Sequence, residues 1–301
     1  MKFSLKIKSD VMDLLLPAIL TALIIGAVYA LIALGLALVF GAMKIINLAH
    51  GELVLLAAYV GYMFESQWGY NPYLSIPVAF ALVGLVASLI FILLSFITKQ
   101  RELNSLIFTY SFGIIITNAL LIIARNEPRM SAQMQETVEP LLAVDIFATY
   151  SQIIALVLSV LLMAALWLWL KNSWYGRAVR AVTSNRDASK LMGINPVRTE
   201  LLSFVLAAFL ASVAGIALYT FQPVTPSLGH MLTIKAFVIT VLAGIGSIPG
   251  VLVGSILLAL AQTLTESYFS ASFANMVAML LFLTVLVFLP NGLFGKAQRR
   301  G

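Results

Sequence analysis

The chain of 301 residues contains no cysteine and only two histidines. Without thiols it cannot form a disulfide, bind a metal through thiolates or use a cysteine nucleophile. The histidines, His50 and His230, lie 180 residues apart, and no cluster of acidic residues with metal-ligand spacing accompanies them. We therefore expect no metal site and no catalytic arrangement in this chain.

Charged residues are also scarce, at 10% of the chain, whereas hydrophobic residues make up 61% and the mean hydropathy is +1.03. A soluble domain has roughly 25% charged residues. So apolar a chain requires a lipid bilayer as its solvent, where helices satisfy their own backbone groups. The net charge of +6 does not indicate a nucleic-acid partner, because lysine and arginine gather in the cytoplasmic loops of membrane proteins.

The sequence also lacks the nucleotide-binding pattern G-x-x-x-x-G-K-[ST]. We expect no cofactor on this chain, and any ATP chemistry that it uses has to come from another polypeptide. The chain is therefore expected not to be an enzyme.

Long apolar runs predict an all-α polytopic membrane protein with a single transmembrane domain over 1–301. The predicted helices cover 14–40, 51–66, 73–98, 104–124, 150–170, 201–221, 233–248, 250–268 and 273–290. The runs near 44–66 and 223–248 are short and interrupted by glycine, a feature of broken or re-entrant helices. If 44–66 does not cross fully, the protein has eight transmembrane helices, and if it does, nine.

Basic residues predict the orientation. The largest basic cluster lies in 171–200, and the 98–102 turn and the C-terminal tail also carry basic residues, so we expect all three to be cytoplasmic. The mixed, acidic segment 125–145 is expected on the opposite side. Eight helices would put the lysines of the N-terminus in the cytoplasm, and nine would put them outside.

Within the basic cluster, the sequence predicts a short surface helix over 186–192. Asn185 is a suitable N-cap, and Asp187 lies in the first turn, where a carboxylate is favourable for the helix dipole. Gly193 is a suitable residue to end the helix in a left-handed conformation.

Leu191 and Met192 give this polar segment an apolar ridge. One interpretation is a docking knob for the groove of a partner protein. The other is an interfacial helix lying on membrane lipid, with its basic residues on the headgroups, and composition alone favours this second interpretation.

The stretch "KIINLAHGELVLLAAY" places polar residues inside an apolar region. Asn47, His50 and Glu52 either join helices by hydrogen bonds, with Glu52 paired to Lys44 or capping the next helix, or they line a substrate path. Further polar candidates for such a path lie in later spans: Tyr110, Asn118, Gln222, Thr225 and His230. Because His50 and His230 each precede a short helix and a turn, an internal inverted repeat is possible.

Four motifs, in order, resemble one family. They are "GLALVFGAMKIINLAHGELVLLAAYVGY", "GRAVRAVTSNRDASKLMGINPVR", "AGIGSIPGVLVGSILLAL" and "FLPNGLFG". Over about 11–295 the chain is similar to permease subunits of branched-chain amino-acid ABC importers, and more similar to the shorter of the two permeases of such a system. The segment "RDASKLMG" departs from the "EAA…G" loop of other ABC importers.

The resemblance implies a heterodimeric pore with a second homologous permease, two cytoplasmic ATPase subunits that carry ATP-Mg, and an extracytoplasmic substrate-binding protein. It places the chain in a bacterial-type inner membrane and makes 171–200 the ATPase-coupling loop. The residues assigned to that loop are Arg177, Arg180, Asn185, Arg186, Asp187, Ala188, Leu191, Met192 and Gly193. Alternatives are a permease for urea or short amides, and a secondary, ion-coupled transporter.

Overall fold

The computed structural model describes residues 2–97, 99–135, 148–244, 247–289 and 292–294, with side chains described from residue 15 onward. Its helices are α1 (Lys2–Met43), α2 (His50–Trp68), η1 (Pro72–Ser75), α3 (Ile76–Ser95), α4 (Arg101–Ala124), α5 (Tyr150–Asn172), α6 (Trp174–Ser184), α7 (Arg186–Leu191), α8 (Pro196–Phe221), α9 (Leu228–Ala243), α10 (Ile248–Tyr268) and α11 (Ala271–Phe288). An isolated β-bridge joins Arg129 and Val224.

Seven of these helices are long and apolar enough to cross a membrane, and α9 is a shorter apolar helix. The predicted class, an all-α polytopic membrane protein, is therefore confirmed. The helix α2 is a further element that begins at a break in the chain and carries Glu52 in its first turn.

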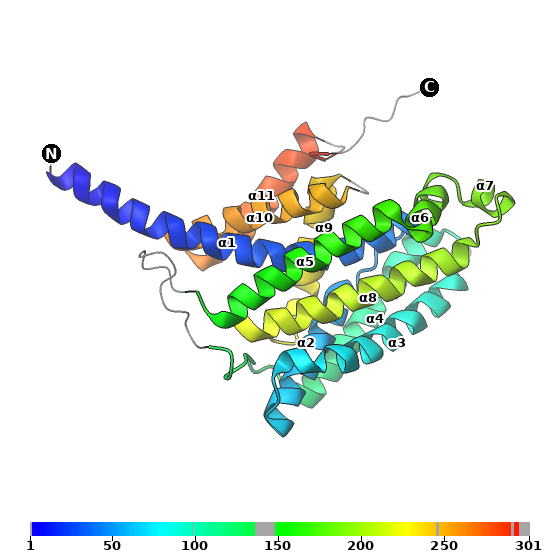
Figure 1. Cartoon of the computed structure of the whole chain (residues 1–301), viewed down its shortest axis with the longest axis horizontal. Coiled ribbons are helices and arrows are strands. Elements are labelled where there is room, and N and C mark those ends of the chain that lie inside the picture. Colours follow the sequence, from blue (N-terminus) through cyan, green and yellow to red (C-terminus); the bar gives the residue numbers. More distant parts are fainter. Residues whose placement is uncertain (1, 98, 136–147, 245–246, 290–291, 295–301) are drawn as a thin grey trace.

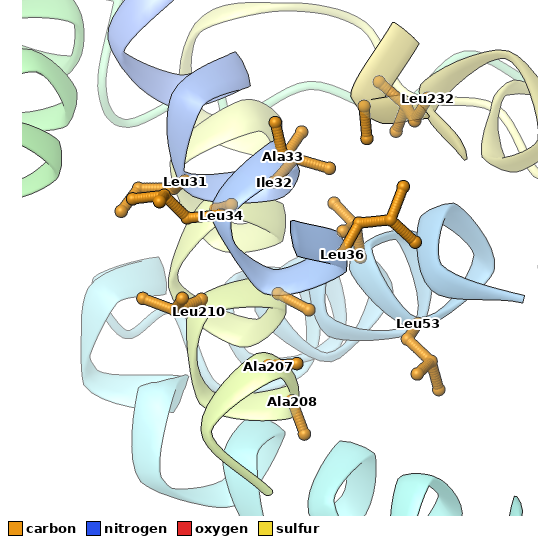
Figure 2. Packing of buried hydrophobic residues seen from close by; sticks show 14 of the residues in the cluster. Leu31, Ile32, Ala33, Leu34, Leu36, Leu53, Ala207, Ala208, Leu210 and Leu232 are labelled. Atoms are coloured by element: carbon orange, nitrogen blue, oxygen red, sulfur yellow. The ribbon is translucent and has the colours of Figure 1, made fainter. Parts of the chain in front are cut away.

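The centre of the molecule is built from α1, α2 and α8, whose facing residues are small or aliphatic. Leu31, Leu34, Leu53 and Ala207 of these helices belong to one buried apolar cluster, part of which is drawn in Figure 2. Without a hydrophobic drive between helices in lipid, close approach depends on small residues. At Gly215 of α8, an added Cβ would lie 2.0 Å from the carbonyl oxygen of Val54, so α8 crosses α2 at this contact distance only because residue 215 is glycine.

The helices α4, α5 and α11 form the periphery. In the most apolar stretch of each helix, only 22% of the residues of α4, 22% of those of α5 and 11% of those of α11 are buried inside the protein. The corresponding shares are 78% for α1 and 72% for α8. Their exposed apolar faces are suited to lipid or to another membrane subunit.

Contacts at the helix ends fix the relative directions of the chain. The Thr183 hydroxyl of α6 donates to the Gly41 carbonyl oxygen, so α1 ends beside α6. In contrast, Glu65 near the end of α2 accepts from backbone N–H groups of Ala132 and Gln133 at the other end of the molecule. The start of α1 lies far from α6 and α7 (Figure 1).

Candidate functional site

The predicted helix break near 44–66 is confirmed, and its backbone polar groups find local partners. Lys44 has a φ of 58°, which ends α1 and turns the chain back toward the core. The N–H of Leu48 donates to the Thr109 hydroxyl of α4 at 3.1 Å. The N–H of Ala49 donates to the Asn47 side-chain oxygen at 3.1 Å. An interrupted helix in an apolar core therefore leaves these groups satisfied, as membrane burial requires.

The N-terminal ends of α2 and α9 cross in direct backbone contact. The N–H of Gly51 donates to the Thr233 hydroxyl at 2.8 Å, and a Cβ added at Gly51 would lie 2.0 Å from the Gly229 carbonyl oxygen. The Thr233 hydroxyl also donates within α9, to the Gly229 carbonyl oxygen at 3.2 Å. Two short helices that both follow a break thus begin at one buried point.

Glu52 lies at this crossing with 4% of its surface exposed. Its side-chain oxygen accepts from the Thr233 hydroxyl at 3.4 Å, and its carboxylate lies in the first turn of α2, where the helix dipole favours a negative charge. The alternative of a Lys44–Glu52 ion pair is wrong: the ion pairs of the described residues do not include it, and Lys44 is exposed.

His50 ties α2 to α1. Its Nε2 lies 2.9 Å from the Ile32 carbonyl oxygen, and the ring packs against Gly35, where an added Cβ would lie 2.7 Å from the imidazole carbon. The side chain is 1% exposed. In this conformation His50 and Glu52 have the geometry of side chains that join helices, whereas Asn47 binds the backbone of the break itself.

Tyr110 and His230 are exposed and contact each other. Their rings meet edge to face, with centroids 5.9 Å apart, so α4 and α9 present one polar aromatic pair near the break. Asn118 is exposed on α4, and its amide donates to the Ile114 carbonyl oxygen in the same helix.

The remaining path candidates lie beside α9. Gln222 lines a cavity of about 290 Å³ that also contains Lys235 and Tyr29. The Lys235 ammonium donates to the Tyr29 hydroxyl at 2.8 Å. The Thr225 hydroxyl lies 3.0 Å from that of Ser227. The structure therefore does not bring the predicted path residues together: some lie at the buried crossing, some are exposed on α4 and α9, Gln222 lines this cavity, and Thr225 lies in the segment before α9.

The short helix α7 forms as the sequence predicts. The Asn185 side-chain oxygen accepts from the N–H groups of Asp187 at 3.1 Å and Ala188 at 2.9 Å, which caps the helix. The helix ends at Leu191, and Gly193 has the left-handed φ of 78° that continues the turn.

The apolar ridge of α7 is almost fully exposed, with Leu191 at 90% and Met192 at 81%. Two basic residues of α6 hold the loop to the helical core. The guanidinium of Arg177 donates to the Asn172 carbonyl oxygen at 3.2 Å, and that of Arg180 donates to the Leu170 carbonyl oxygen at 2.9 Å. Both carbonyls belong to the last turn of α5, where a positive charge is favourable.

A buried carboxylate connects α7 to the transmembrane helices. The side chain of Glu200 in α8 is 2% exposed; its oxygens lie 2.7 Å from Arg186 Nε and 3.4 Å from the Arg101 guanidinium. Hydrogen bonding to Glu200 raises the pKa of Arg186 above its already high value, so the guanidinium stays charged. One acidic residue therefore joins α7, α8 and the first residue of α4.

Sequence reasoning missed Glu200, Arg101 and Thr233. A signal for Glu200 exists, because it is the one acidic residue in the span "TELLSFVLAAFLASVAGIALYTF" and lies in the turn after a basic loop. Thr233 carries no such signal, since threonine in an apolar helix usually bonds its own backbone.

Comparisons with known proteins identify the family. Residues 18–289 match the model described as branched-chain amino acid transport system / permease component. The match spans most of the chain, so this protein belongs to that family of membrane transport permeases.

Individual relatives of this chain belong to the same class of permeases. The chain is 30% identical to the high-affinity branched-chain amino acid transport system permease protein BraD of Pseudomonas aeruginosa, covering 94% of this chain and 96% of the relative. It is 30% identical to the corresponding LivH of Escherichia coli (91% and 93% covered) and 25% identical to a probable LivH of Methanocaldococcus jannaschii (91% and 90% covered). In a solved complex of PsaBC from Streptococcus pneumoniae with a Fab, one chain shares the fold, with a TM-score of 0.51 at 14% identity over 88% of this chain and 90% of that chain.

Proposed function

We propose that this chain is a permease subunit of an ATP-driven importer and forms part of the path for branched-chain or related amino acids. The observation that carries the proposal is α7, a capped helix whose apolar ridge of Leu191 and Met192 is exposed on a polar loop. Such a ridge fits a hydrophobic groove on a partner protein. The family's role in amino-acid transport supports the substrate class.

The ion-pair cluster at Glu200 supports a route by which movement of α7 reaches the transmembrane core. Arg186 of α7 and Arg101 of α4 both bind this buried carboxylate. In turn, Thr109 of α4 accepts from the backbone of the break at Leu48. When the ATPase subunits close, they displace α7. The displacement is passed through α4 to the crossing of α2 and α9, and the movement of this crossing opens or closes the path.

The helix break supplies the path with a movable polar element. At the α2–α9 crossing, Glu52 and Thr233 hold two helix N-termini together. If these ends part, their N–H groups become donors for the carboxylate of a zwitterionic substrate. Tyr110 and His230 lie exposed beside this point and line the path in the assembled transporter.

The partners follow from the surfaces. A second, homologous permease packs on the exposed faces of α4 and α9, two ATPase subunits that hold ATP-Mg dock at α7 in the cytoplasm, and a substrate-binding protein docks at the opposite face. The absence of a nucleotide-binding motif in the sequence supports ATP hydrolysis on separate subunits. On this proposal the coupling loop and the C-terminus are cytoplasmic, in an inner membrane.

The test is the double substitution Leu191→Asp and Met192→Asp in the chain co-expressed with its partner subunits. We expect loss of ATPase co-purification and of nucleotide-driven amino-acid uptake, with normal membrane insertion. Phe269→Asp is the matched control, because Phe269 is an equally exposed apolar residue, at 81%, at the end of α10. Uptake that survives the double substitution, or uptake by this chain alone without nucleotide, would contradict the proposal.

A further inference from the structure

A second polar cavity lies between α2 and α4, away from the predicted path residues. Its volume is about 410 Å³, and residues of α2 and α4 line it, including Leu56, Tyr59 and Leu120. On α2, positions 52, 56 and 59 share one helix face, because they are spaced by three or four residues. On α4, Gly113 contacts Glu52 and Leu120 lies two turns further along. The cavity therefore continues along the same α2–α4 seam from the buried crossing toward the end of α2.

The guanidinium of Arg129 is held in place at this cavity. The backbone of Arg129 pairs with Val224 in both directions, at 2.9 and 2.8 Å, and its side chain forms an ion pair with Glu127. Its guanidinium carbon lies 5.0 Å from the centre of the Tyr62 ring. A side chain held by two contacts on a paired backbone is preorganised to bind a ligand, since little further rotamer entropy is lost.

Two hydrogen-bond donors at the cavity have no acceptor. Among the described residues, the hydroxyl of Tyr59 and the Nε of Arg129 are buried without a hydrogen-bond partner. Tyr59 is 4% exposed. A buried polar group left unpaired costs roughly 1–3 kcal/mol, so two such groups in the lining of one cavity indicate an acceptor that arrives with a ligand.

We infer that this cavity is a binding site for an α-amino acid with a branched apolar side chain, occupied on the way to the helix break. The substrate carboxylate accepts from the Tyr59 hydroxyl and Arg129 Nε. The ammonium group pairs with Glu127, and the side chain packs on Leu56 and Leu120. The inference rests on the proposed function and adds a specific site to it.

The lining offers partners for both charges of a zwitterion. Arg125 and Arg129 would attract an anionic lipid phosphate as well as a substrate carboxylate, whereas Glu127 would repel the phosphate and pair with an ammonium group. The volume lies at the low end of the range of about 300–1,000 Å³ for small-molecule sites, as suits a single amino acid. The donor pair, the carboxylate and the apolar wall match the three parts of such a substrate.

The experiment measures binding of radiolabelled leucine to the assembled transporter in lipid nanodiscs without nucleotide. Tyr59→Phe removes only the hydroxyl, and we expect affinity for leucine to fall about tenfold, the effect of one hydrogen bond to a charged group. Leucinol, which lacks the carboxylate, should bind weakly, and with the same affinity to the unmodified protein and to the Tyr59→Phe variant. Tyr70→Phe is the control, because Tyr70 is exposed beyond the end of α2 and does not line this cavity.

The outcomes separate this site from the broader proposal. Unchanged leucine affinity in Tyr59→Phe and in Arg129→Gln overturns the site, while ATPase stimulation by amino acids in the same samples leaves the proposed function intact. Retention of an anionic lipid that is lost in Arg129→Gln, with leucine binding unaffected, also overturns it. If no amino acid binds or stimulates any variant, both the site and the proposed function fail.

Discussion

The helix break at 44–52 and the short helix α7 differ from their surroundings in opposite ways. The break places polar groups in an apolar core, whereas α7 places apolar groups on a polar loop. At the break, Glu52 accepts from Thr233 and His50 Nε2 lies 2.9 Å from the Ile32 carbonyl oxygen, while His50 Nδ1 is buried without a partner. On α7, Leu191 is 90% exposed. Hydrogen bonds between helices indicate internal structure, and an exposed apolar ridge on a polar loop indicates a partner.

The largest effect is expected from closing the space at the break. Gly51→Ala would place a Cβ 2.0 Å from the Gly229 carbonyl oxygen, a backbone atom that cannot move without displacing α9. We expect a loss of about 3 kcal/mol in the free energy of unfolding, at the upper end of overpacking costs. Thermal unfolding of the purified protein in detergent measures it.

The matched control is Gly41→Ala in α1, where an added Cβ has no atom within 4 Å. This change should stabilise the helix by up to about 1 kcal/mol, because alanine loses less backbone entropy on folding. Equal unfolding midpoints for the two variants would show that the α2–α9 crossing is not closely packed.

A smaller loss of stability is expected at Glu200, whose ion pairs connect α7 to α4 and so to the helix break. Glu200→Gln leaves Arg101 and Arg186 beside a neutral amide, and we expect a loss of about 2 kcal/mol, below the range for fully buried pairs because both guanidiniums are partly exposed. ATP hydrolysis by the assembled transporter should continue, but uptake should become uncoupled from it. Glu102→Gln, at an exposed residue of α4 that does not take part in these ion pairs, should change neither the stability nor the coupled uptake. If uptake by the Glu200→Gln variant stayed coupled to ATP hydrolysis, the ion pairs of Glu200 would not transmit movement from α7 to the helix break.

The smallest effect concerns α7 itself. Asn185→Ala removes the cap that binds the N–H groups of Asp187 and Ala188, which is worth about 1 kcal/mol. Because a six-residue helix depends on its cap, we expect roughly fivefold weaker binding of the ATPase subunits, measured by titration. Asn185→Ser should restore most of the affinity, and an unchanged affinity in Asn185→Ala would mean that the helix is not the docking element.

Much of the fold could be predicted because the bilayer imposes one simple pattern. Each predicted apolar run contains most of a helix, although the run predicted at 233–248 forms α9 five residues earlier, over Leu228–Ala243, and residues 245–246 lie outside the described residues. Asn185 and Gly193 delimit α7 as capping chemistry requires. The break was predictable for the same reason, since polar residues such as His50 are rare in apolar spans and stand out.

Other parts of the site could not be predicted because they depend on contacts distant in sequence. The Thr233 hydroxyl meets the N–H of Gly51, 182 positions away, and no local pattern indicates that pairing. The positive-inside count did not fix the side of the N-terminus, whereas the contact between Gly41 and Thr183 shows that the end of α1 lies beside α6. Tyr59 and Arg129 became a candidate site only through a cavity that their sequence positions do not suggest.

The most direct test of the central claim uses the absence of cysteine in the chain, because Leu191→Cys introduces a single thiol on α7. Tyr70→Cys, at an exposed residue beyond the end of α2, reports on the opposite face. A membrane-impermeant maleimide should label position 191 only in inside-out vesicles and position 70 only in intact cells. Bound ATPase subunits should protect position 191. Labelling of position 191 from outside intact cells, or equal labelling with and without the ATPase subunits, would contradict the account.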